Sequence, residues 1–218
     1  MHIALLLTCG YLVGSVPFGV IVGRAWRGVD VRRFGSGNIG FSNVLRVLGP
    51  GPAAVVLLGD VLKGLIPVLA GRGLLASWSV PQPDLWLLAI ALAPVLGHSF
   101  SVFLGFRGGR AVATTYGALL GMHWPAALLG VAVWLGAVAI TRYISVGSIT
   151  AAAAVPIYMA LTGARWEWAV FWSLVAVLVI ARHIPNLRRL RQGSESKIGQ
   201  RVDLEGRPGG PSEGQSDD

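Results

Sequence analysis

The chain has 218 residues, of which 54% are hydrophobic and only 13% are charged, and its formal net charge is +8. Soluble domains average about 25% charged residues, and the apolar residues here lie in long blocks, so the composition indicates a multi-pass membrane protein and not a soluble domain. A single cysteine, Cys9, excludes a disulfide framework or a zinc cluster within one chain, and arginines beside apolar blocks favour anionic lipids and anionic substrates over nucleic acid.

Seven apolar segments predict an all-α fold, a polytopic membrane bundle of about seven transmembrane helices with a short interfacial amphipathic helix. Their approximate ranges are 3–23, 52–71, 85–104, 111–122, 124–140, 146–162 and 166–182. The fourth segment falls short of the about 20 residues that cross a bilayer. One possibility is that this segment crosses the bilayer where the bilayer is locally thinned. The other is that it joins the fifth segment in one long helix, although Gly121 and Pro125 favour a turn between the two segments.

Charge placement favours seven separate spans with the N-terminus outside. This topology places 15 Lys and Arg residues inside and two, Arg72 and Arg165, outside, whereas a fused fourth and fifth segment would spoil the bias. Arg24 and Arg27 follow the first segment instead of preceding it, which indicates a retained helix and not a cleaved signal peptide. We therefore expect the basic loops, the site and the C-terminus in the cytoplasm.

The loop between the first two segments contains a short amphipathic helix. Asn38 is expected to cap this helix, and Gly49-Pro50 to end it. One face carries Phe41, Val44, Leu45 and Leu48, and the other carries Ser42, Asn43 and Arg46. We expect the helix to lie in the membrane interface, with its polar face toward the cytoplasm or toward a site.

The junction of the third and fourth segments reads Arg107-Gly108-Gly109-Arg110. Two guanidinium groups flank two residues without side chains, so positive charge and backbone N–H groups could meet on one small anion. The pattern predicts a phosphate-binding loop at the membrane surface. The alternative is a topology signal, which two arginines between apolar segments commonly provide.

Four polar clusters fall on the predicted cytoplasmic side. They are Ser36, Asn38, Asn43 and Arg46; His98, Arg107–Arg110 and Thr114; Arg142, Tyr143, Ser145 and Ser148; and Arg182, His183, Asn186, Arg189 and Glu195. Guanidinium, hydroxyl and amide groups suit a phosphate monoester that bears hydroxyls. Each cluster alone could tether a helix end to lipid headgroups, but four on one face favour a site. For His98 and His183, a structural hydrogen bond and a ligand role both stay open.

Asp60 and Lys63 lie three residues apart in the second segment, so they share a helix face and are expected to pair. Charges inside a membrane indicate function by default, and a paired strut that orients the helix is the alternative. Motifs of other enzyme classes are missing: the sequence has no His-x-x-x-x-Asp, His-Glu-x-x-His, Gly-x-Ser-x-Gly or P-loop pattern. No metal or cofactor site is predicted.

Taken together, these motifs resemble the membrane-integral, acyl-phosphate-dependent glycerol-3-phosphate acyltransferases of bacteria, the PlsY family. The resemblance extends from about Gly14 to Gly199. It rests on Gly14–Gly19, Gly35–Gly40, Ser42–Arg46, Asp60–Gly64, Gly97-His98, Val102–Leu104, Arg107–Arg110, Val112–Thr114, Thr141–Tyr143 with Ser145 and Ser148, Arg182-His183, Asn186, Arg189-Leu190, Gly193, Glu195 and Lys197-Ile198. Chance does not account for so many motifs in one order.

The resemblance implies a seven-helix enzyme of the bacterial inner membrane that transfers a fatty acyl group from acyl phosphate to the 1-hydroxyl of sn-glycerol 3-phosphate. The products are lysophosphatidate and inorganic phosphate, in the first acylation of phospholipid biosynthesis, and no cofactor is implied. Catalytic roles fall on Ser36, Arg46, His183 and Asn186, and structural roles on Asp60, Lys63 and Glu195. The implied substrate-binding residues are Gly37, Asn38, Asn43, His98, Arg107, Gly108, Gly109, Arg110, Thr114, Ser145, Ser148 and Arg182.

The chain departs from the family pattern in three places. It has Arg107-Gly-Gly-Arg110-Ala111 for Lys-Gly-Gly-Lys-Gly, Phe41-Ser42-Asn43 for Ala-Thr-Asn, and Ser99-Phe100-Ser101 for Asn-Phe-Pro. Arginine keeps the charge but holds phosphate as a planar fork, and Ala111 restricts the backbone beside the loop. We expect activity with a shifted substrate affinity or acyl preference.

Two other functions stay open. A small transporter or binding protein for phosphorylated anions would use the same arginines, although no polar ladder crosses the bilayer apart from Asp60 and Lys63. The second is an enzyme of the same family with a different acceptor alcohol. Residues 1–199 are expected to form one transmembrane domain, and the polar residues 200–218 a disordered cytoplasmic tail.

Overall fold

The computed structural model describes residues 2–202, so most of the predicted tail, from residue 203 onward, lies outside the described residues. Within this range the fold is helical, in agreement with the predicted all-α class. The helices are α1 (His2–Ser15), α2 (Phe18–Arg27), α3 (Phe41–Leu48), α4 (Pro50–Ser77), α5 (Pro83–Ser99), α6 (Val112–Met122), α7 (Trp124–Thr141), α8 (Ile144–Leu161), α9 (Trp166–Arg182) and α10 (Ile184–Arg191). Two short 3-10 helices, η1 (Val31–Arg33) and η2 (Val102–Leu104), lie in loops.

Helices occupy most of each of the seven predicted apolar segments, and the chain is built as a multi-pass membrane protein. Five described stretches are long and apolar enough to cross a membrane: His2–Arg27, Pro50–Ser77, Pro83–Leu104, Trp124–Thr141 and Ile144–Leu161. The pair α9 and α10, which meet at a bend of 51°, would make a sixth. Helix α6 has 11 residues, fewer than a full span needs. The count of seven crossings therefore stays a prediction.

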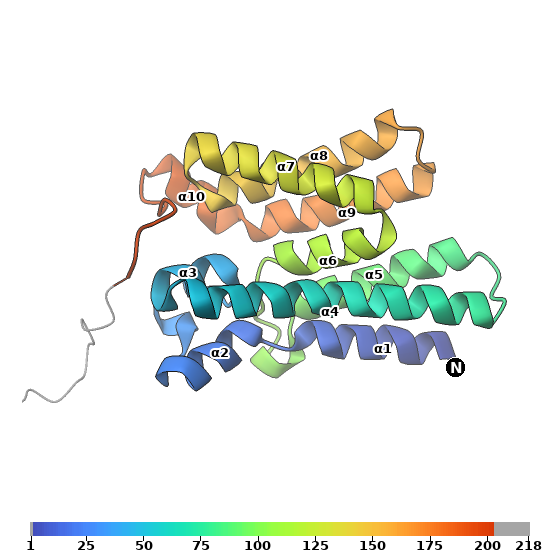
Figure 1. Cartoon of the computed structure of the whole chain (residues 1–218), viewed down its shortest axis with the longest axis horizontal. Coiled ribbons are helices and arrows are strands. Elements are labelled where there is room, and N and C mark those ends of the chain that lie inside the picture. The colour runs from blue at the N-terminus through green and yellow to red at the C-terminus, as the bar shows by residue number, and fades with distance from the viewer. Residues whose placement is uncertain (1, 203–218) are drawn as a thin grey trace, which may run out of the picture.

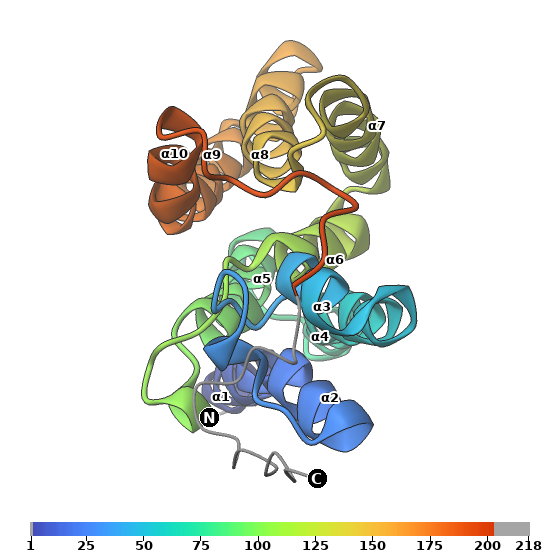
Figure 2. The same ribbon diagram turned by 90° about the vertical axis from the view of Figure 1, so that its left-hand side faces the viewer.

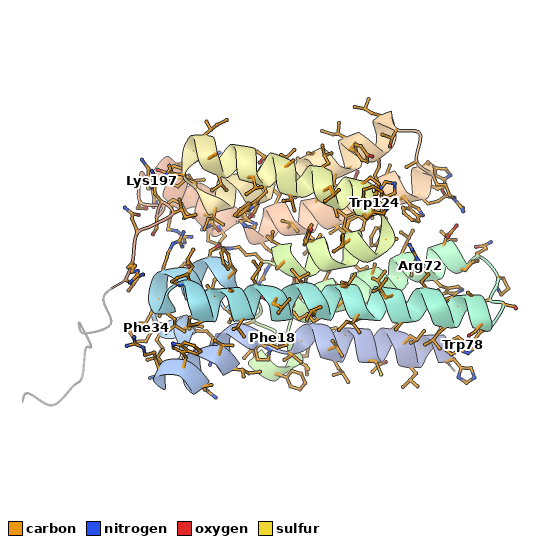
Figure 3. The ribbon with its side chains drawn as sticks, in the orientation of Figure 1. Phe18, Phe34, Arg72, Trp78, Trp124 and Lys197 are labelled. Carbon is orange, nitrogen blue, oxygen red and sulfur yellow. The ribbon has the colours of Figure 1, made fainter. Side chains whose placement is uncertain are left out.

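The long helices form two groups, with α6 between them. Helices α1, α4 and α5 pack in one group and α7, α8 and α9 in the other, and one apolar core extends through both (Figures 1 and 2). Helices α2, α3 and α10 gather at the end of the bundle far from the N-terminus (Figure 1). Figure 3 shows Phe34 and Lys197 at this end and Arg72 and Trp78 toward the opposite end. Aromatic and basic side chains at both ends are typical of a protein that crosses a bilayer.

The first predicted segment, 3–23, is broken and not continuous as expected. Pro17 divides it into α1 and α2, because proline lacks the N–H that a continuous helix requires. At the break, the Val16 carbonyl oxygen accepts from the Phe18 N–H at 3.1 Å and from the buried ammonium of Lys63 at 2.9 Å. Lys63 also forms the expected ion pair with Asp60, at 2.7 Å.

Helices α4 and α6 approach each other closely at two glycines. A Cβ atom at Gly64 would overlap the Thr114 carbonyl oxygen, and one at Gly117 would overlap the Val61 carbonyl oxygen. Small residues permit this contact between helix backbones in membranes, where packing replaces the hydrophobic effect. The contact holds the start of α6 against α4.

Residues 193–202, the C-terminal strap, connect the two groups of helices (Figure 2). The N–H of Ile198 donates to the Arg142 carbonyl, just before α8, at 2.8 Å. On the other side, Nη2 of Arg46 in α3 donates to the Ser196 carbonyl at 3.1 Å. The strap therefore ties α3 to α8 at one end of the bundle.

Glu195, in the strap, holds three side chains from two helices. Its carboxylate accepts hydrogen bonds from Ser145 Oγ at 2.9 Å, Asn186 Nδ2 at 2.7 Å and Arg189 Nε at 2.7 Å. Burial alone would raise the pKa of this carboxyl, but the three hydrogen bonds outweigh burial and hold the pKa below its usual value. Glu195 is therefore charged at neutral pH and connects α8 with α10.

We expect Gly64→Ala to lower the melting temperature of the protein in detergent, because the added Cβ forces the α4 and α6 backbones apart at a cost of about 1–3 kcal/mol. Gly73→Ala is the matched control in the same helix. A Cβ there has open space, so its melting temperature should be unchanged or slightly raised. Equal melting temperatures for the two variants would contradict the close contact at Gly64.

We expect Glu195→Gln to destabilise the protein at neutral pH by roughly 1.5–3 kcal/mol, because charge-assisted hydrogen bonds are lost. The folded-state pKa lies below the unfolded value, so this stability is present above about pH 4.5 and disappears as the pH falls through the folded pKa. Melting temperatures of the wild type and the variant, measured against pH, should therefore converge in acid.

The control for this series is Asp84→Asn, which breaks an exposed ion pair with Arg165 and should have little effect at neutral pH. A difference between the wild type and Glu195→Gln that stays constant with pH would show that the carboxylate charge contributes nothing.

Candidate active site

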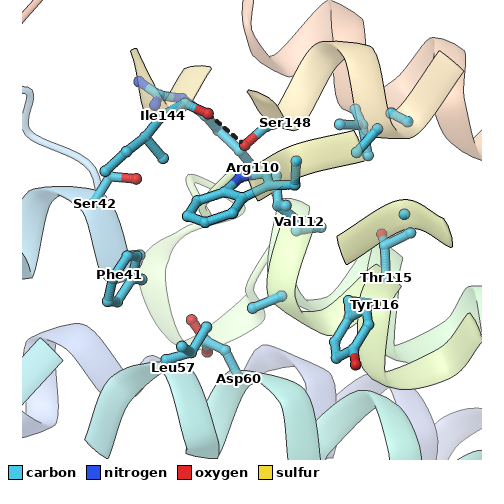
Figure 4. A pocket seen from close by; sticks show the side chains of 18 of the residues that line it. Phe41, Ser42, Leu57, Asp60, Arg110, Val112, Thr115, Tyr116, Ile144 and Ser148 are labelled. Carbon is cyan, nitrogen blue, oxygen red and sulfur yellow. Dashed lines mark hydrogen bonds between the residues drawn. The ribbon is translucent and has the colours of Figure 1, made fainter. Parts of the chain in front are cut away.

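A cavity of about 460 Å³ lies between the two groups of helices and is lined by residues from α3 through α9. Most of its polar residues gather at the end near α3 and the start of α6. Figure 4 shows Arg110 and Ser148 on one side of the cavity, Asp60 on the opposite side, and Ser42 on α3. The remaining walls, along α6, α7 and α8, are largely apolar. The cavity therefore fits a ligand with a polar head and an apolar chain.

Arg110 lines the polar end of the cavity, and three further arginines, Arg46, Arg182 and Arg189, lie near it together with the carboxylate of Glu195. Burial, and then repulsion by Arg189, lower the pKa of Arg110 to about 10, with smaller repulsion from Arg46 and Arg182. Burial also lowers the pKa of Arg46, and the attraction of Glu195 partly offsets this. Both guanidinium groups stay protonated at neutral pH. The end of the cavity is therefore strongly cationic.

Several buried polar atoms at this end have no hydrogen-bond partner within residues 2–202. They include Nε of Arg46, Nη2 of Arg189 and Oδ1 of Asn186. An unpaired buried polar group costs about 1–3 kcal/mol, and two of these three atoms belong to cations. Unused donors among like charges fit an anionic ligand that would supply both the missing acceptors and the missing charge.

The Arg-Gly-Gly-Arg loop does not present its glycine N–H groups to a ligand, which corrects the expectation from sequence. The Gly108 N–H donates to the Ser99 carbonyl at 3.2 Å, and the Gly109 N–H donates to the His98 carbonyl at 2.9 Å. The carbonyls of both glycines accept from Arg182, at 2.7 and 3.0 Å. The loop backbone is thus bound on both sides, and Arg182 positions the loop.

The two arginines of the loop face different surroundings. Arg110 lines the cavity, whereas Arg107 is exposed and does not line it. Helix α6 begins beside Arg110, and Ala111–Ala113 also line the cavity. The first N–H groups of a helix have no partner within it and favour anions. Arg110 and the start of α6 therefore offer the positive charge and the free donors that the loop was expected to supply alone.

Ala111 connects the loop to α6 in a left-handed conformation, with φ of 57°. An alanine pays an energetic cost there that glycine does not, and glycine is the residue that the family pattern has. The departure noted in the sequence therefore falls on a backbone position where it strains the chain.

His98 is buried beneath the loop. Its Nδ1 atom lies 3.5 Å from Oδ1 of Asp60, and a Cβ atom at Gly109 would overlap its Nε2 atom. Both His98 and Asp60 line the cavity. Lys63 thus contacts Asp60, Asp60 contacts His98, and His98 packs against Gly109 of the loop. These contacts favour a role for all three side chains in positioning the loop.

Within the first predicted cluster (Ser36, Asn38, Asn43 and Arg46), Asn43 holds the loop before α3 through hydrogen bonds. The N–H and the hydroxyl of Ser36 donate to Asn43 Oδ1, at 2.8 and 3.2 Å, and Asn43 Nδ2 donates to the carbonyls of Val31 and Phe34. Asn43 is therefore occupied within the protein, although it lines the cavity. Gly37, a predicted substrate-binding residue, is exposed and does not line it.

Asn38 does not cap α3 as expected. The cap residue is Gly40, and its N–H donates to Asn38 Oδ1 at 3.1 Å in the turn before the helix. Asn38 and Ser42 line the cavity, and Arg46 is buried on the same polar face. This face of α3 therefore turns toward the cavity.

The remaining predicted residues take different positions. Ser148 and His183 line the cavity, whereas Thr114 is fully buried and does not. The Ser148 hydroxyl donates to the Ile144 carbonyl at 2.9 Å (Figure 4). Nδ1 of His183 lies 2.8 Å from the Val179 carbonyl, which only accepts, so Nδ1 carries the hydrogen and Nε2 is left for other partners.

Sequence analysis missed the apolar walls of the cavity. Leu57, Tyr116, Trp134 and Leu135 line it, but each lies in a segment that is apolar on all sides. No periodic pattern separates a side chain that faces a cavity from one that faces lipid in such a segment.

The chain is similar to known membrane acyltransferases. A family profile described as glycerol-3-phosphate acyltransferase matches residues 4–193. The glycerol-3-phosphate acyltransferase of Synechococcus sp. (strain JA-3-3Ab) is 46% identical over 192 residues, which cover 88% of this chain and 91% of the relative. The enzyme of the same name from Thermus thermophilus is 47% identical over 199 residues, with 90% and 96% covered.

The fold is also similar to that of a solved structure. The crystal structure of PlsY (YgiH), an integral membrane glycerol 3-phosphate acyltransferase, in its glycerol 3-phosphate form, superposes with a TM-score of 0.83 at 36% identity, covering 91% of this chain and 96% of that chain. Its lysophosphatidic acid form gives a TM-score of 0.81 at the same identity. The chain therefore belongs to the glycerol-3-phosphate acyltransferase family.

Proposed function

We propose that this protein transfers a fatty acyl group from acyl phosphate to the 1-hydroxyl of sn-glycerol 3-phosphate, giving lysophosphatidate and inorganic phosphate. The observation that carries the proposal is a cavity with a cluster of arginines at one end and apolar walls along the rest. Both the donor and the product join a phosphate to a long apolar chain, and this shape matches them. The solved relatives in glycerol 3-phosphate and lysophosphatidic acid forms support the same substrates.

The phosphate of the acceptor is assigned to Arg110 and the start of α6. Arg110 lines the cavity and stays protonated, with its pKa lowered to about 10, and the helix start adds free N–H donors. A guanidinium binds phosphate as a planar fork, which also orients the attached glycerol. Arg182 and His98 contribute by holding the loop in place.

Acyl phosphate is a mixed anhydride, so the reaction needs no covalent enzyme nucleophile. The glycerol hydroxyl oxygen forms a bond to the acyl carbon, the bond from that carbon to the phosphate oxygen breaks, and phosphate leaves with its electron pair. The protein holds the hydroxyl near the carbon and stabilises the departing charge. We assign the second task to Arg46 and Arg189, whose unpaired buried N–H groups face no protein acceptor among the described residues.

The remaining catalytic assignments follow from position. The Ser36 hydroxyl donates to Asn43 on α3, the helix that also carries Arg46, and Asn186 donates to Glu195, which accepts from Arg189. We assign Ser36 and Asn186 to orienting these arginines and the substrate. His183 offers Nε2 at the cavity wall as a hydrogen-bond partner for substrate. Arginine cannot act as a base near neutral pH, which leaves His183, water and a substrate phosphate as acceptors of the hydroxyl proton. From the resemblance to the family, we assign the proton to a substrate phosphate.

The basic end of the bundle is assigned to the cytoplasm. Positive residues concentrate on the cytoplasmic side of membrane proteins, and α2, α3, α10 and the strap, each of which carries at least one arginine, share one end of this molecule. In a bacterium, this orientation places the site at the inner face of the cell membrane. There it would meet glycerol 3-phosphate from the cytoplasm and acyl phosphate from the membrane surface. Residues 1–199 act as one domain in this proposal.

The proposal is tested by offering the purified protein acyl phosphate, acyl-CoA and acyl carrier protein separately, each with labelled glycerol 3-phosphate. We expect labelled lysophosphatidate from acyl phosphate alone, because the charge cluster is placed to receive a phosphate leaving group. Product from acyl-CoA or from acyl carrier protein, and not from acyl phosphate, would refute the assignment of acyl phosphate as the donor. No product from any donor would favour a transporter or binding protein for phosphorylated anions.

We expect Arg110→Ala to raise the KM for glycerol 3-phosphate by at least about tenfold, because a charge-assisted bond to phosphate is worth roughly 1.5–3 kcal/mol. Arg107→Ala is the matched control, since it removes the same charge from an exposed side chain of the same loop. It should change the KM by less than about threefold. Comparable increases for both variants would place the phosphate outside the cavity.

A further inference from the structure

The apolar part of the cavity has a definite inner end. On α8 the lining residues extend from Ile144 to Val155, and on α6 from Ala111 to Leu119. At 1.5 Å per residue, the stretch on α8 is about 17 Å long. The cavity therefore runs lengthwise between the helices, away from the arginines and toward the opposite end of the bundle.

Three residues form this inner end. Leu119 and Val155 are the lining residues farthest from the polar end on α6 and α8, and both are buried in the apolar core. Helix α7 runs antiparallel to α8, so its first lining residue, Gly130, lies deepest. Gly130 is also buried. A leucine, a valine and a glycine thus close the cavity.

Close helix packing does not require a glycine at position 130. A Cβ atom there would meet only Val155 Cγ2, at 3.6 Å, which is an ordinary van der Waals distance. At Gly147, in the same pair of helices, a Cβ atom would come within 3.0 Å of the Trp134 carbonyl oxygen. Glycine inside a helix costs up to about 1 kcal/mol relative to alanine. The missing side chain at Gly130 therefore leaves space in the cavity that packing alone would fill.

We propose that Gly130 sets the length of acyl chain that the protein accepts. This inference rests on the proposed function, in which the acyl chain of the donor occupies the apolar part of the cavity. The last carbons of a long chain lie across Gly130, between Leu119 and Val155. A larger side chain at position 130 would occupy their place and shorten the cavity without touching the polar end.

The experiment measures kcat/KM for octanoyl, dodecanoyl and hexadecanoyl phosphate with the wild type and with Gly130→Leu. If the leucine displaces two methylene groups, each worth about 0.8 kcal/mol, the hexadecanoyl-to-dodecanoyl ratio of kcat/KM falls by about fifteenfold. The matched control is Gly136→Leu, in the same helix at an exposed position where a Cβ has open space, and its ratio should equal that of the wild type. The KM for glycerol 3-phosphate should be unchanged in both variants.

Two milder variants keep the test decisive if Gly130→Leu does not fold. Gly130→Ala should lower the same ratio by a smaller factor, and Val155→Ala, which enlarges the inner end, should raise it. An active wild type with unchanged ratios in these variants would overturn the role of Gly130 and leave the proposed function intact. A wild type that uses none of the acyl phosphates would overturn the proposed function, and the inference with it.

Discussion

An excess of positive charge at the end of the cavity is the constraint on which the rest of the structure depends. Arg46, Arg110 and Arg189 interact with a single carboxylate, Glu195, and Arg182 adds a further charge. These cations repel one another, and the repulsion is only partly screened where they are buried. A bound phosphate dianion would offset most of the excess. Substrate binding and charge compensation are then one event, which gives the site its preference for phosphorylated compounds.

Such a cluster persists only if the backbone around it is held by other bonds. The glycine loop hydrogen-bonds to the end of α5 on one side and to Arg182 on the other, so its position does not depend on a ligand. The strap fixes Arg46 through the Ser196 carbonyl. Beneath the loop, Asp60 and Lys63 neutralise each other in the core. These bonds hold the loop and α3 without a ligand, and in the proposed reaction such preorganised charge would stabilise a departing phosphate.

In the proposed function, the same architecture separates the two halves of an amphipathic substrate. The polar end of the cavity lies near α3 and the start of α6, and its apolar walls extend along α6, α7 and α8. The short helix α6 lines both the polar end and the apolar walls of the cavity. It begins just after Arg110, and its later turns lie along the apolar walls. Its glycine contacts with α4 fix that orientation.

Hydropathy and charge placement by themselves determined the helical segments, the basic end and the clusters that meet there, because a bilayer imposes these patterns on any chain that crosses it. They did not reveal that Pro17 breaks the first helix, that the glycine N–H groups are used internally, or that Arg107 lies outside the cavity. Only the tertiary structure decided these points and the course of the apolar cavity. The reason is physical: hydrogen-bond partners and cavity walls come from helices far apart in the chain, and an apolar helix carries no local mark of which neighbour it will face.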